Sequence, residues 1–229
     1  MGHEHEDDDE HGGSGEPGHH HFPGLDPHQV LPDPSAIASP APVLELAAAC
    51  VRFVATIVSS VAGGDPKPGL APDFTPETLS LVDYYVTESR KALAERPEAL
   101  PLTANAVGAY LGEVIKRCHR CWWRIDDGDP SGWRLEFESA MLSFYPMQVA
   151  YALLASDESA DDQFSGFELR EDDRGAVTDR LADLPPVSER EYMLPSTRLE
   201  VLDIALETLV AKEVSDPLGK RAYRPEDYA

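Results

Sequence analysis

The sequence predicts an α+β protein in which helices pack on a small antiparallel sheet, behind a disordered N-terminal tail. Apolar residues recur at helical spacing in several long segments, and apolar and polar side chains alternate across residues 122–138. Acidic and histidine residues crowd the N-terminus. We expect a His- and acid-rich tail over residues 1–42, a single α+β domain over residues 43–215 and a C-terminal tail over residues 216–229.

Residues 1–34 differ in composition from the rest of the chain. They contain nine Asp and Glu and no Lys or Arg, and so carry −9 of the formal net charge of −23. Few apolar side chains are available to offset the entropy that ordering this segment would cost. The composition therefore predicts that the tail is disordered.

The first long apolar segment, "LELAAACVRFVATIVSSVA" at residues 44–62, is the one candidate for a membrane span. Its charged residues Glu45 and Arg52 each disfavour a bilayer by a few kcal/mol, and no basic flank follows. We therefore expect a buried core helix and no membrane partner.

Two further helices are predicted by their apolar stripes. Thr75 as N-cap and Pro76 at the first helical position indicate a helix that ends before Pro97. Near the C-terminus, "SEREYM" offers a capping box from Ser188 to Glu191. The last long helix has a stripe of Leu199, Leu202, Leu206 and Leu209.

A helix that begins near Thr103 contains two glycines one turn apart, Gly108 and Gly112. Each costs roughly 1 kcal/mol of helix propensity, so we expect close packing against another helix or the sheet. Glu113 falls off the apolar face and is expected to form a solvated i+4 ion pair with Arg117.

The segment after this helix has the period of a strand. "WWRID" and "WRLEFE" flank the polar turn "DGDPSG", which predicts a β-hairpin with one buried face. "AMLSFY" is expected to add a third strand, and "FELRE" is a weaker candidate. Trp122 and Trp123 point to opposite faces, so we expect one of them to mark an exposed face.

The run "AVGAYLGEVIKR", followed by "WWRID" and "WRLEF", resembles bacterial families of unknown function in which a G-x-Y-x-G-E-V helix leads into a Trp-bearing strand. The resemblance covers residues 102–155. It implies an α+β domain and carries no activity. The chain departs from that pattern in having "CHRC" between helix and tryptophan, where glycine or small polar residues are expected.

The "CHRC" motif allows three interpretations. A structural zinc site needs four ligands and usually a second paired knuckle, which the sequence lacks. A redox motif normally opens a helix, whereas this one closes a helix. Structural packing is therefore favoured, with zinc and thiol redox chemistry as alternatives, and Cys118, His119 and Cys121 are a secondary candidate metal site.

The net charge and the cysteines indicate compartment and partners. A charge of −23 and a pI near 4.5 disfavour nucleic acid and anionic lipid. The three cysteines form no even disulfide framework, and the acidic N-terminus does not resemble a secretory leader. We expect a cytoplasmic protein with reduced thiols.

The sequence contains no phosphate-binding glycine loop, nucleophile elbow, H-E-x-x-H motif or EF-hand loop. We therefore expect a non-catalytic protein-interaction or regulatory module with an unidentified protein partner. The alternative is binding or buffering of divalent zinc, nickel or copper by the tail, and an enzyme without a recognisable signature comes third. The candidate metal ligands of the tail are its seven histidines, namely His3, His5, His11, His19, His20, His21 and His28.

Overall fold

The computed structural model describes residues 37–62, 71–126, 128–155, 166–217, 219 and 222–228. Every described residue belongs to the second of two units of the chain, residues 33–229. Of the tail predicted to be disordered, residues 1–42, only residues 37–42 are among the described residues.

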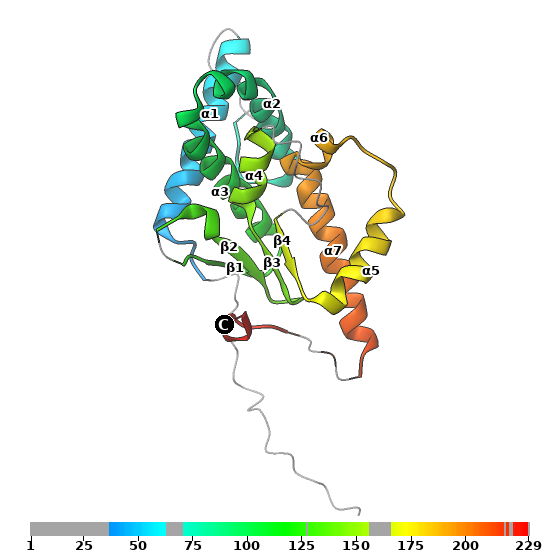
Figure 1. Cartoon of the computed structure of the whole chain (residues 1–229). Coiled ribbons are helices and arrows are strands. Elements are labelled where there is room, and N and C mark those ends of the chain that lie inside the picture. Colours follow the sequence, from blue (N-terminus) through cyan, green and yellow to red (C-terminus); the bar gives the residue numbers. More distant parts are fainter. Residues whose placement is uncertain are drawn as a thin grey trace, which may run out of the picture. The chain divides into compact units, whose positions relative to one another are not determined.

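The second unit is an α+β domain, as predicted, with helices packed on a small antiparallel sheet (Figure 1). The helices are α1 (Ala41–Ala62), α2 (Leu79–Glu95), α3 (Leu100–Cys118), α4 (Pro146–Ala155), α5 (Glu171–Ala182), α6 (Glu189–Tyr192) and α7 (Pro195–Ser215). Four short 3-10 helices are η2 (Pro76–Thr78), η3 (Pro97–Ala99), η4 (Pro130–Gly132) and η5 (Pro225–Tyr228).

The sheet is a four-stranded antiparallel meander in the order β1-β2-β3-β4. Its strands are β1 (Cys121–Arg124), β2 (Arg134–Phe137), β3 (Leu142–Phe144) and β4 (Phe167–Leu169). The predicted hairpin, the third strand and the weaker fourth strand are all present. Register places Trp122 opposite Glu136 and Trp123 opposite Leu135, so the two tryptophans face opposite sides of the sheet.

Helix α3 is the central element of the core, and its glycines explain how closely its neighbours approach. A Cβ on Gly108 would lie 2.6 Å from the Met147 Cα at the start of α4. A Cβ on Gly112 would lie 2.2 Å from the Trp123 ring. The prediction that these glycines permit close packing is confirmed on both sides, against a helix and against the sheet.

Glu113 does not form the expected solvated ion pair. Its Oε1 accepts a hydrogen bond from the indole Nε1 of Trp123 at 2.7 Å. Arg117 instead donates to the Asp73 carbonyl at 2.7 Å and lies over the ring of Phe74. The prediction was wrong because the strand that follows α3 returns an indole donor to the Glu113 side of the helix.

Neither tryptophan of β1 marks an exposed face. Trp123 is 8% exposed on the α3 side, and Trp122 is 3% exposed on the opposite side, where the Tyr228 ring meets it edge-on at 5.8 Å. The Tyr228 hydroxyl donates to the Phe137 carbonyl at 2.7 Å, which fixes the end of the chain on the sheet. Residues 222–228, assigned from sequence to a C-terminal tail, thus cover the second face.

Helix α1 covers the core with one face. Val43, Ala47, Cys50 and Val54 are fully buried, whereas Leu44 on the other side is 48% exposed. From Ala41 to Val61 the helix is long and apolar enough to cross a membrane by length and composition, and 28% of that stretch is buried within the protein. One such helix is weak evidence for a membrane span, because apolar core helices of soluble proteins have similar length and composition, although those are mostly buried.

Candidate protein-interaction site

The segment between α5 and α7 is shaped by its prolines and by a capping box. Helix α5 ends at Ala182, and Pro185 and Pro186 then prevent the helix from continuing. The Ser188 side chain accepts from the Glu191 backbone N–H, and the Glu191 carboxylate accepts in return, which confirms the predicted capping box and starts α6. The chain therefore leaves α5, crosses in an extended stretch and turns back into α7.

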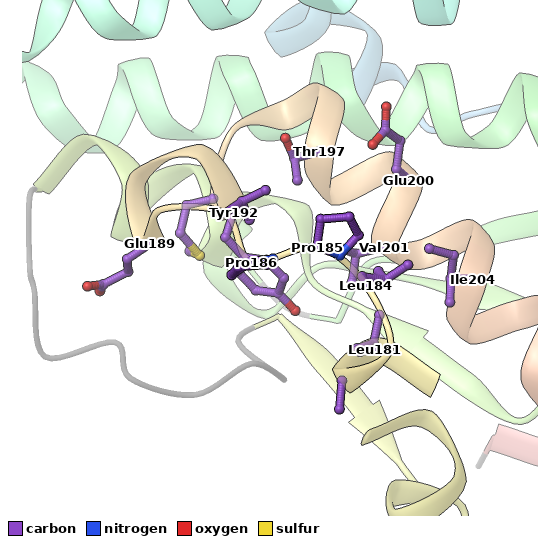
Figure 2. Close-up of a pocket in the computed structure, with 13 residues that line it drawn as sticks. Leu181, Leu184, Pro185, Pro186, Glu189, Tyr192, Thr197, Glu200, Val201 and Ile204 are labelled. Atoms are coloured by element: carbon purple, nitrogen blue, oxygen red, sulfur yellow. The ribbon is translucent and has the colours of Figure 1, made fainter. Parts of the chain in front are cut away.

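This path encloses a groove of about 680 Å³ between the end of α5, the crossing segment, α6 and the first half of α7 (Figure 2). We call it the α5–α7 groove. Its volume lies within the roughly 300–1,000 Å³ typical of ligand sites. The lining residues are Leu181, Ala182, Leu184, Pro185, Pro186, Val187, Glu189, Tyr192, Met193, Thr197, Glu200, Val201 and Ile204.

The groove is apolar along its depth and open at its edge. Met193 and Val201 are buried at 6% and 4% exposure and belong to the hydrophobic core. Ile204 and Leu181 are half-buried, whereas Val187 is 53% exposed. The apolar lining thus includes both residues of the core and residues at the surface.

A buried arginine positions one wall of the groove. Arg198 is fully buried on α7, and its guanidinium lies 4.9 Å from the ring centre of Tyr192 and 4.6 Å from that of Phe167. Cation–π contacts of this kind are worth about 2 kcal/mol or more when desolvated. Arg198 therefore connects the wall residue Tyr192 to strand β4.

Two carboxylates flank the opening. Glu189 and Glu200 line the groove and lie on opposite sides of it in Figure 2. The lining of the groove contains these two carboxylates and no Lys or Arg. The opening therefore presents a negative potential around an apolar floor.

At its other end the α5–α7 pair is held by charged groups. Asp173 accepts from Arg170 Nε at 2.6 Å and from Lys212 Nζ at 2.7 Å. Burial alone would raise the pKa of Asp173, but these two cationic partners outweigh it and hold the pKa below its ordinary value. The Arg170 guanidinium also donates to Glu213 at 2.7 Å, as does the Tyr223 hydroxyl at 2.5 Å. This junction is ionic, whereas the groove is apolar.

The seven tail histidines predicted as metal ligands all lie outside the described residues. Of the secondary set, Cys118 is exposed at the end of α3 and Cys121 is buried in β1. Among the residues that the structure describes, no group of three or more His, Cys, Asp or Glu side chains is placed to hold a metal ion. The structure therefore does not gather Cys118, His119 and Cys121 as a three-ligand site.

A second, more polar hollow of about 470 Å³ lies beside the "CHRC" motif. His119 Nε2 lies 2.7 Å from Asp203 Oδ1, and Cys118 and Ser139 share the lining. Although the Cys118 side chain is exposed, partial desolvation raises the pKa of its thiol, and the Asp203 and Glu77 carboxylates raise it further. A thiol in that state is a poor nucleophile at neutral pH, which weakens a catalytic interpretation of this hollow.

Sequence reasoning did not find the α5–α7 groove. The signal was present as the run "LPPVSER", in which apolar residues and two prolines separate a helix end from a capping box. No family model, curated protein or solved structure matches the chain. The resemblance of residues 102–155 to bacterial families with a G-x-Y-x-G-E-V helix therefore stays a prediction.

Proposed function

We propose that this protein is a non-catalytic interaction module, and that the α5–α7 groove is where it binds a partner protein. The observation that carries the proposal is a groove whose apolar lining ranges from the buried Val201 to the half-exposed Val187, with the carboxylates of Glu189 and Glu200 beside it. An apolar patch with a polar rim is typical of interaction sites.

The shape of the groove favours a protein over a small molecule. Small-molecule sites typically enclose 70–90% of the ligand surface and place a few polar groups to fix its orientation. Here the Val187 edge is exposed, so a small molecule in the groove would leave part of its surface in contact with water. A larger partner can cover the exposed edge as well as fill the floor.

Photo-crosslinking in the native cell tests the proposal. A benzoyl-phenylalanine at position 187 is expected to form an adduct with a protein that mass spectrometry identifies and that binds the purified full chain. The matched control places the same probe at Tyr151, which is 48% exposed on α4 and outside the groove. An adduct at 187 that the Ile204→Asp change abolishes supports the proposal, and the lack of any protein adduct at 187 overturns it.

The compartment is part of the same proposal. Cys50, Cys118 and Cys121 are all free thiols, and burial raises the pKa of Cys50 to about 12. Free thiols that are not held in disulfides suit a reducing compartment. We therefore propose that the protein acts in the cytoplasm, with a protein rather than nucleic acid or a membrane as its partner.

Metal binding by the tail is a second candidate function, supported by the seven histidines among nine carboxylates in residues 1–34. Histidine and carboxylate ligands of this kind would give several weak sites that prefer copper, nickel or zinc to magnesium, and that weaken below about pH 6 as imidazoles protonate. Deletion of residues 1–34 is expected to abolish most metal uptake in calorimetry with little change in melting temperature. Unchanged uptake by the truncated chain would contradict this candidate.

A further inference from the structure

We infer that the occupant of the α5–α7 groove is a basic amphipathic helix of the partner protein. This inference rests on the proposed function and makes it specific, since it assigns both a backbone conformation and a charge to the bound segment. Three features of the groove support the inference: its backbone, its apolar floor and its carboxylates.

The backbone of the groove disfavours an extended peptide. A peptide that binds as a strand needs unpaired N–H and C=O groups on its host. The crossing segment contains Pro185 and Pro186, which have no N–H to donate. The remaining walls come from helices α5, α6 and α7, and none of the strands β1–β4 contributes to the lining. A helical segment suits such a site because it satisfies its own backbone hydrogen bonds.

The floor of the groove fits the apolar stripe of a helix. Val201 and Ile204, one turn apart on α7, lie opposite the crossing segment with Leu184 and Pro185, as Figure 2 shows. Amphipathic helices bind such grooves through anchors at positions i, i+3, i+4 and i+7. Val187 at the edge can contact the flank of the bound helix, which would remove its exposed apolar surface from water.

The charge around the groove selects a basic helix. Glu189 and Glu200 lie on opposite sides of the opening, so lysine or arginine on either flank of the apolar stripe would meet a carboxylate. Placing like charges together across an interface costs several kcal/mol, which opposes an acidic partner. The net charge of −23 on the chain would also speed the approach of a basic segment.

Calorimetry on the full chain with three synthetic peptides tests this inference. The first is an amphipathic helix of about 18 residues, or five turns, with leucines at i, i+3, i+4 and i+7 and lysines on the other face. The second has glutamate in place of every lysine, and the third has the first composition in a scrambled order. We expect the first peptide to bind at least about tenfold more tightly than the others, and more weakly as salt is raised.

Matched variants locate the binding. The pair Glu189→Lys and Glu200→Lys is expected to weaken the lysine peptide at least about tenfold, whereas Glu45→Lys on the exposed side of α1 makes the same kind of charge change away from the groove. Ile204→Asp is expected to abolish binding, and Val214→Asp, at a position 60% exposed on the same helix, to leave it unchanged. Circular dichroism checks that each variant remains folded.

The outcomes separate this inference from the proposed function. Equal binding of the lysine and glutamate peptides overturns the basic helix. Crosslinks from position 187 to a partner that binds through an extended segment overturn the helix and leave the interaction module intact. Binding of a fluorescent fatty acid in the groove, lost in Ile204→Asp, with no binding of any peptide and no protein crosslink, overturns both.

Discussion

The α3–α4 pair and the α5–α7 pair both bring apolar helix faces together, but they differ in how closely the chain allows it. In the first pair Gly108 lets the α4 backbone come so close that a Cβ at position 108 would lie 2.6 Å from the Met147 Cα. In the second pair the crossing segment, which contains Pro185 and Pro186, borders a groove of about 680 Å³ that α7 also lines. The same class of side chain thus stabilises the fold in one region and remains available for binding in the other.

We expect the largest loss of stability from a substitution in the closely packed core around α3 and α4, which we call the closed region. Trp133 is 6% exposed, lies directly after η4 and belongs to the core that includes α3 and α4. We expect Trp133→Ala to lower the free energy of unfolding by about 3–5 kcal/mol through lost burial and a cavity. Chemical denaturation measures this, and a change below about 1 kcal/mol, the range of a surface site, would remove Trp133 from the core.

Two glycine substitutions should have effects of opposite sign. Gly108→Ala is expected to destabilise by about 1–3 kcal/mol, because the methyl group would overlap the backbone of Met147 and Pro146. Gly175→Ala on α5 is expected to stabilise by about 0.5–1 kcal/mol, since nothing lies within 4 Å of its Cβ position and alanine favours the helix.

Thermal unfolding of the Gly108→Ala and Gly175→Ala proteins compares the two helix pairs directly. If both substitutions stabilise the protein, α3 and α4 are not in backbone contact and the distinction between a closed and an open pair fails.

Acid should loosen the α5–α7 pair before the closed region. The pKa of Asp173 is lowered below its ordinary value near 3.8, because ion pairs with Arg170 and Lys212 outweigh burial. Its carboxylate therefore contributes stability at pH values above the unfolded pKa, and this contribution is lost as pH falls through the lower folded pKa.

Hydrogen exchange as a function of pH measures this loosening. Amides of α5 are expected to lose protection below about pH 4 while those of α3 remain protected. Asp173→Asn should make the protection of α5 independent of pH in this range, and a pH profile of α5 that this variant leaves unaltered would contradict the assignment.

The smallest stability effect is expected inside the groove. Val187 is 53% exposed, and Val187→Ala removes its two methyl groups. The free energy of unfolding should therefore change by less than about 0.5 kcal/mol. The affinity for the lysine peptide should fall, because those methyl groups would be covered on binding. A Val187→Ala protein that is clearly destabilised with unchanged affinity would show that the residue packs in the fold.

Local patterns in the sequence predicted much of the fold, and contacts between distant segments explain what they missed. Alternation in "WRLEFE" predicted β2, and the leucine stripe from Leu199 to Leu209 predicted α7. Tyr228 covers Trp122 across 106 positions of sequence, and no local pattern specifies such a pairing.

The candidate site was missed for a similar reason. Its walls come from three helices and the segment that crosses between them, and no local pattern specifies how far apart these segments lie in the fold. The residues that sequence did single out, Cys118, His119 and Cys121, lie at the end of a helix and the start of a strand, where one thiol is exposed and the other is buried.

Methyl NMR of the full chain during titration with the lysine peptide tests the central claim most directly. Binding in the groove should shift the methyl signals of Val187, Val201 and Ile204, and leave those of Val107, Leu111 and Val114 in α3 unchanged. Shifts confined to the exposed side of α1, around Leu44, or no shift in the groove at saturating peptide, would show that the open α5–α7 region is not the binding site.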